Sequence, residues 1–125
     1  MILGIGLEMA DIPLLQTWSE ERDSAFEGVF APNELTYALK KRKAGEHLAA
    51  RYAAKRALLK AAAQKPSPEI ALEQIWIERA KSGKPSIHLS EELSQRLQIK
   101  ATDRLHVTLS HTGDIAVALV VWERI

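Results

Sequence analysis

The stretch ARYAAKRALLKA, residues 50–61, consists mainly of alanine, leucine and basic residues and predicts a helix, which we expect to run over residues 46–63. At about 100° per residue, one face of this helix carries only small side chains. These are Ala50, Ala53, Ala57 and Ala61. A face of this kind allows another helix or a sheet to approach closely, so the rest of the fold must supply an element that packs against it.

The same helix carries four cations in two pairs, Arg51 with Lys55 and Arg56 with Lys60, each with i, i+4 spacing. Like charges at this spacing repel each other by a few tenths of a kcal/mol. Two interpretations stay open. The long side chains extend outward from an Ala-rich helix into solvent, or they bind an anion that lies between them.

Charge is distributed unevenly along the chain. The residues up to Glu34 are predominantly acidic, whereas residues 40–60 are predominantly basic, although the net charge is only +1. Two solvated faces of opposite sign, or an anion site, would both give this pattern. Binding of nucleic acid is disfavoured, because the basic segment has no recognised motif and no aromatic platform on which bases could stack.

The length of 125 residues predicts a single domain over residues 1–125. The chain has no cysteine, which excludes a disulfide framework and a thiolate metal site and fits a reducing compartment. The start, MILGIGLEMAD, has no basic segment and is interrupted by Glu8, so we expect neither a signal peptide nor a membrane span. A cytoplasmic protein is expected.

Pattern and turn residues predict an α+β fold, with an N-terminal strand, a helical block and an antiparallel β half. Glycines at positions 4 and 6 of the first strand indicate close contact with another element. The expected elements are a strand over 1–7, a helix over 11–26 capped by Asp11, a helix from Pro32 that Gly45 ends, the helix over 46–63, a loop over 65–68, a strand over 70–80, a turn over 81–85, a helix capped by Ser90 and ending at Leu97, and strands over 105–111 and 115–123 around a Thr-Gly-Asp turn.

Four motifs together resemble one family. GIGLEMADI, RYAAKRALLKA, GKP and HVTLSHTGDIAVALVV occur in the order and at the distances found in the holo-acyl-carrier-protein synthase family of 4'-phosphopantetheinyl transferases, and the similarity runs over residues 1–122. The resemblance implies the fold of that family and an enzyme that moves the phosphopantetheine arm of coenzyme A onto a serine of an acyl carrier protein. It also implies a homotrimer with active sites between subunits, serving fatty acid biosynthesis.

The resemblance also implies roles for individual residues. Glu8, Arg56 and Lys60 take the catalytic positions. The coenzyme A positions are Arg51, Lys55, Gly83, Lys84, Pro85, Ser110 and His111. Without the family, Ser110 and His111 would suggest a hydrolase pair, but neighbouring strand residues point to opposite faces and the chain has no G-x-S-x-G motif.

Two departures concern the metal that the family uses, Mg²⁺. Glu8 stands where the family has an aspartate, and Arg56 stands where it has a glutamate. Mg²⁺ requires oxygen ligands, so of the two positions that hold the metal in the family only Glu8 still offers a ligand. Two hypotheses follow: Arg56, held by Glu8, supplies the positive charge itself, or the two residues form an ion pair that closes an inactive site.

Two other departures concern the coenzyme and the carrier protein. The family continues the long helix into a Gly-Thr-Gly turn, whereas this chain reads AAAQKPSP. Its first helix is also acidic, unlike the basic helix that docks the acidic carrier protein, so either residues 40–43 dock the carrier or the partner is unusual. The alternative function is a catalytically inactive relative that binds coenzyme A or a carrier protein as an assembly factor.

Overall fold

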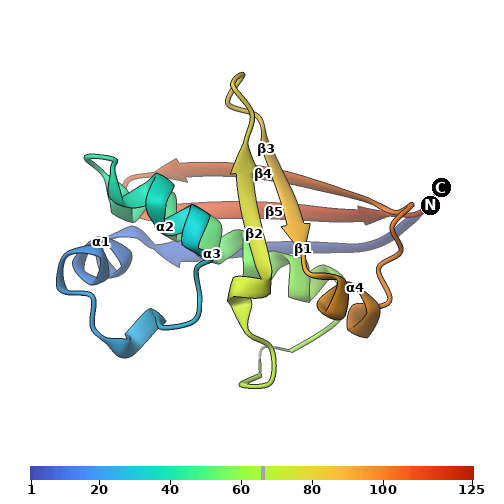
Figure 1. The fold of residues 1–125 in the computed structure, drawn as a ribbon. Helices are drawn as coiled ribbons and strands as arrows, with labels where there is room; N and C mark the ends of the chain where they lie inside the picture. Colours follow the sequence, from blue (N-terminus) through green and yellow to red (C-terminus); the bar gives the residue numbers. More distant parts are fainter. Residues whose placement is uncertain (66) are drawn as a thin grey trace.

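A three-stranded antiparallel sheet, with strand order β1-β5-β4, packs against one long helix, and a two-stranded hairpin stands beside it (Figure 1). The computed structural model describes residues 1–65 and 67–125. The expected α+β class is confirmed. The elements are β1 (Ile2–Asp11), α1 (Ile12–Glu21), α2 (Pro32–Leu39), α3 (Ala44–Ala61), β2 (Ile75–Arg79), β3 (Pro85–Leu89), α4 (Glu91–Leu97), β4 (Arg104–Thr112) and β5 (Ile115–Glu123).

Helix α3 lies directly on β1, because both elements present almost no side chain where they meet. A Cβ atom added to Gly4 would lie 1.8 Å from the carbonyl oxygen of Ala61, and one added to Gly6 would lie 1.8 Å from that of Ala57. Ala53 and Ala57 on the helix are fully buried. The predicted small-residue face and the predicted close contact at the strand glycines are therefore confirmed, and they are two sides of one interface.

The other side of the sheet has no covering element within the described part of the chain. On β1, Ile5, Leu7 and Met9 are 60%, 54% and 61% exposed. Each is paired with an apolar residue of β5, Leu7 directly with Leu119. We call this surface the open face; it consists of Ile5, Leu7, Met9, Val117, Leu119 and Val121.

The C-terminal half follows the predicted pattern closely. Strands β4 and β5 pair through Thr112 and Ile115, around a two-residue turn in which Gly113 has φ +55°. Ser90 caps α4, since its hydroxyl accepts a hydrogen bond from the amide of Leu93 at 3.1 Å. Both elements were expected from their turn and capping residues.

Several predicted boundaries are wrong. Strand β1 continues to Asp11 because its pairing with β5 continues to Ile115, and Asp11 occupies the N-cap of α1 without a side-chain capping bond. The first helix ends at Glu21, and a short 3-10 helix over Ser24–Phe26 follows. Gly45 does not end a helix; it lies in the first turn of α3, where a Cβ would approach the Gln16 side chain to 2.6 Å.

In the hairpin region, the strand expected over 70–80 is limited to β2, and β3 was not predicted at all. The loop expected over 65–68 includes Pro66, which lies outside the described residues. Throughout residues 1–65 and 67–125, the helices are too short or too polar to cross a membrane.

Candidate active site

The three predicted catalytic residues meet where α3 lies on β1. Glu8 follows Gly4 and Gly6 at two-residue spacing, so its side chain is on the same face of β1 and points to α3. Arg56 Nη2 lies 3.7 Å from Glu8 Oε2, and Lys60, one helical turn further, donates to the carbonyl oxygen of Leu7 at 3.4 Å. The structure thus forms a surface cluster from Glu8, Arg56 and Lys60.

The members of this cluster are accessible to a ligand. The side chains of Arg56 and Glu8 are 33% and 22% exposed, and Lys60 is exposed. The guanidinium of Arg56 lies 5.5 Å from the centre of the Tyr52 ring, which supports it from the side of the helix. Within residues 1–65 and 67–125, no hydrogen bond uses the guanidinium donors of Arg56, so they are available to an anion.

Lys55, which was expected to bind coenzyme A, does not lie on this surface but in the interior. Its side chain is 0% exposed, and its ammonium donates to the carbonyl oxygens of Val29 at 2.8 Å and Leu72 at 3.0 Å, as well as to Ile75 and the Glu34 carboxylate. Burial lowers the pKa of Lys55, and the Glu34 carboxylate counters this effect. No donor of Lys55 remains for a phosphate.

Arg51 is buried against the same carboxylate. Its Nε lies 3.9 Å from Glu34 Oε2, and its guanidinium stacks 4.6 Å from the centre of the Tyr37 ring. Burial lowers the pKa of Arg51, and Glu34 again acts in the opposite direction. With a side chain 2% exposed, Arg51 lies beneath the surface at which coenzyme A was expected to meet it.

Glu34 organises this interior and was missed as an important residue. One carboxylate oxygen accepts the amide of Ala31 at 3.0 Å, and the other accepts the amide of Ile77 in β2, also at 3.0 Å. A signal was present in the sequence: Glu34 is in the first turn after Pro32, where a glutamate commonly bonds back to the helix start. Its partners on α3 and β2 could not be identified from that signal.

Ser110 and His111 point to opposite faces of β4, as the alternation predicted. Ser110 is paired with Val117 on the open face, whereas His111 is paired with the buried Ala116. The His111 ring lies 3.4 Å from a carboxylate oxygen of Glu46, near the start of α3. The two side chains cannot act together as a nucleophile and base.

The turn that carries Gly83, Lys84 and Pro85 is at the tip of the β2–β3 hairpin. Gly83 has φ +89°, and its carbonyl accepts a hydrogen bond from Arg79 at 2.7 Å. Figure 1 shows this tip standing clear of the sheet and of α3. A single chain therefore does not bring the turn to the cluster of Glu8, Arg56 and Lys60.

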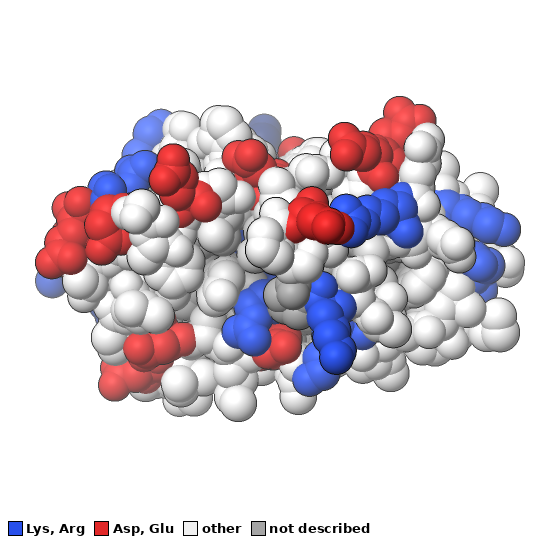
Figure 2. Space-filling model, turned by 90° about the horizontal axis from the view of Figure 1, so that it is seen from below, with Lys and Arg blue, Asp and Glu red and all other residues white. Residues whose placement is uncertain are grey.

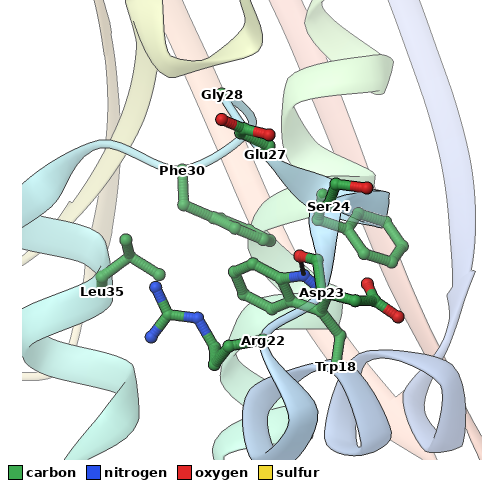
Figure 3. A pocket seen from close by; sticks show the side chains of 9 residues that line it. Trp18, Arg22, Asp23, Ser24, Glu27, Gly28, Phe30 and Leu35 are labelled. Carbon is green, nitrogen blue, oxygen red and sulfur yellow. Dashed lines mark hydrogen bonds between the residues drawn. The ribbon is translucent and has the colours of Figure 1, made fainter.

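The structure also contains hollows that the sequence did not indicate. One, of about 420 Å³, lies beside α1, where Trp18 packs edge-on against Phe26 and Arg22 stacks over the Trp18 ring at 4.8 Å (Figure 3). A larger groove of about 1080 Å³ runs between the hairpin, α4 and β4. Within the part of the chain that the structure describes, none of the predicted site residues lines either hollow.

Charges of both signs are mixed on the face of the molecule seen from below. Figure 2 shows acidic and basic side chains next to one another across this face. Over the part of this face that the structure describes, basic side chains do not form one continuous surface.

Comparison with known proteins gives a consistent result along the whole chain. No protein-family model matches. The holo-[acyl-carrier-protein] synthase of Geotalea daltonii is 33% identical over 99% of this chain and 100% of the relative. The holo-[acyl-carrier-protein] synthase structure from Neisseria meningitidis has a TM-score of 0.83 at 29% identity, covering 99% of this chain and 100% of that one. The ACPS-CoA complex from Chronobacterium ammoniagenes has a TM-score of 0.81 at 30% identity, covering 98% and 97%.

Proposed function

The chain belongs to the holo-acyl-carrier-protein synthase family, and we propose that it transfers the 4'-phosphopantetheine group of coenzyme A to a serine of an acyl carrier protein. The observation that carries this proposal is the similarity over the full length to enzymes of that name. The accessible cluster on β1 and α3 adds support, because it presents Arg56 and Lys60 to solvent where a pyrophosphate needs cationic donors.

In this reaction the protein mainly positions the two substrates and stabilises charge. The carrier serine and the coenzyme must be held in line while negative charge develops on the phosphoryl group and on the departing oxygen. Lys60 supplies an exposed ammonium at the edge of the cluster, and the exposed Lys84 supplies another from the hairpin tip. Electrostatic stabilisation by such donors is the main contribution that the chain makes to the rate.

An inactive relative that only binds coenzyme A or a carrier protein is the less favoured function. Full-length relatives carry the name of the synthase, and a solved relative is a complex with coenzyme A. The Glu8–Arg56 contact of 3.7 Å leaves both side chains partly exposed, so this pair does not seal the surface.

The test is transfer to an apo carrier protein followed by intact mass. Purified protein, coenzyme A and the apo form of a bacterial fatty acid carrier protein are incubated, with the Geotalea daltonii relative as the positive control. A carrier mass increased by one phosphopantetheine supports the proposal. An unchanged carrier mass, under conditions in which the control converts all of it, would count against this function.

We further propose that three copies associate through the open face, so that the hairpin tip of one copy completes the cluster of another. The exposed apolar side chains of β1 and β5 supply the interface, and a second chain brings its hairpin tip to a cluster that the tip of the same chain, standing clear of the sheet in Figure 1, does not reach. Ser110, which was expected to bind coenzyme A, is paired with Val117 and therefore lies at the edge of the same open face.

Leu119→Glu is expected to convert the trimer to a monomer, since it places a charge at the centre of the apolar open face. Light scattering measures the mass of both proteins at the same concentration. Leu14→Glu is the matched control, because it makes the same change at a leucine that is 52% exposed on α1, outside the open face, and it should leave the mass unchanged. A wild-type monomer, at concentrations where transfer occurs, would disprove this assembly.

A further inference from the structure

The residues at the cluster do not fit the Mg²⁺ ion that the family resemblance implies. Mg²⁺ needs several oxygen ligands at close to octahedral geometry. Here Glu8 is the carboxylate of the cluster, and the guanidinium of Arg56 lies 3.7 Å from its oxygen, where it repels a cation. Among the described residues, no group of three His, Cys, Asp or Glu side chains comes together in a way that could hold a metal.

We propose that the Arg56 guanidinium performs the charge stabilisation for which the family uses a metal ion, so that phosphopantetheine transfer by this chain is independent of Mg²⁺. The proposal rests on the proposed function and assigns a further catalytic residue to it. A guanidinium has a permanent positive charge and a planar set of donors that match two phosphate oxygens at once, so it can replace a cation at a pyrophosphate.

The geometry holds Arg56 in a suitable position. Glu8 lies beside one end of the guanidinium at 3.7 Å, and the Tyr52 ring supports the group at 5.5 Å. Its donors form no hydrogen bond within residues 1–65 and 67–125, so a phosphate does not have to displace any such partner. Lys60, four residues further along α3, lies on the same side of the helix and provides a second cation.

The step balances without a metal. The hydroxyl oxygen of the carrier serine forms a bond to the phosphorus that bears the pantetheine arm. The bond from this phosphorus to the bridging oxygen of the pyrophosphate breaks, and adenosine 3',5'-bisphosphate leaves with that oxygen and the electron pair. The serine proton passes to solvent, which reaches the partly exposed cluster. Arg56 and Lys60 stabilise the charge that develops on the phosphate oxygens.

Two measurements test the role of Arg56. The first is calorimetry of coenzyme A binding in a chelator and again in excess Mg²⁺; the second is carrier transfer by intact mass under the same two conditions. In wild type we expect both to be unchanged by Mg²⁺. Arg56→Ala should bind coenzyme A about tenfold more weakly or worse, as expected for the loss of a charged hydrogen bond, and transfer about 100-fold more slowly.

Two variants complete the experiment. Arg56→Glu places a second carboxylate opposite Glu8 and should make both binding and transfer depend on Mg²⁺. Arg96→Ala is the matched control. It also removes a helical arginine that pairs with a glutamate, since Arg96 of α4 lies 3.0 Å from Glu69, but it is outside the cluster and should behave as wild type. Thermal unfolding by circular dichroism checks that every variant is folded.

The outcomes separate the inference from the function. If transfer by the wild type stops in the chelator and returns with Mg²⁺, the proposed role of Arg56 is wrong, but the proposed transferase function is still supported. Coenzyme A affinity that rises tenfold or more with Mg²⁺ in wild type overturns it as well. A third outcome is that coenzyme A binding depends on Arg56 but not on Mg²⁺, while no transfer occurs to a carrier protein that the Geotalea daltonii relative converts. This outcome supports the arginine site and refutes the proposed function.

Discussion

Gly6→Ala is expected to destabilise the protein by about 3 kcal/mol or more, a large part of the 5–15 kcal/mol that holds a typical domain together. The added methyl would lie 1.8 Å from the carbonyl oxygen of Ala57 and 2.8 Å from its carbonyl carbon. These atoms belong to the backbone of α3, so no side-chain rotation relieves the clash. Either β1 or α3 must move, and both are part of the core.

Urea unfolding followed by circular dichroism, at one protein concentration, measures this loss. Gly28→Ala is the control that distinguishes the cost of a steric clash from the cost of a backbone conformation that favours glycine. Gly28 has φ +75° but nothing within 4 Å of an added Cβ, so this change should cost only about 1 kcal/mol, the strain of a left-handed alanine. If Gly6→Ala cost no more than Gly28→Ala, the contact of β1 with α3 would be looser than the structure shows.

Lys55→Met is expected to cost about 3–5 kcal/mol, because it leaves Glu34 buried without its closest cation. It also leaves the carbonyl oxygens of Val29, Leu72 and Ile75 without the donor that joins them. Methionine fills nearly the same space as lysine, so the loss reports on charge and hydrogen bonding rather than on a cavity. The same urea titration provides the measurement.

Lys60→Met is the matched control, since it makes the same change on the same helix at an exposed position whose ammonium has one long contact of 3.4 Å. We expect a change within about 0.5 kcal/mol. Coenzyme A binding by Lys55→Met also tests whether the Lys55 side chain is buried. If Lys55→Met weakened coenzyme A binding while leaving stability unchanged, Lys55 would be a ligand residue and its buried position would be wrong.

The fold was predictable where the pattern is local. The alternation in residues 115–123, the Gly-Asp turn and the capping Ser90 each specify structure over a few residues, and all were found. Strand β3 was missed because it begins with Pro85 and mixes polar and apolar residues over only five positions. Gly45 was misread because close packing against Gln16, not chain reversal, is what requires a glycine there.

The site was predictable only in part. Glu8, Arg56 and Lys60 meet because a strand and a helix with small residues pack together, which the sequence indicated. The burial of Arg51 and Lys55 was not predictable, because their partner Glu34 is on another helix and is one of many acids in the N-terminal segment. Four helical cations look alike in sequence, but two lie inward and two lie outward.

The pairing of β1 with β5 joins the first strand of the sheet to the last, with Leu7 opposite Leu119. During synthesis on the ribosome, β1 emerges first and has no strand to pair with until β5 is released. Contacts between such distant segments form slowly, because a long loop must close before they stabilise the chain. The nascent chain therefore carries Ile5, Leu7 and Met9 unpaired through almost all of its translation, a period in which it is exposed to aggregation.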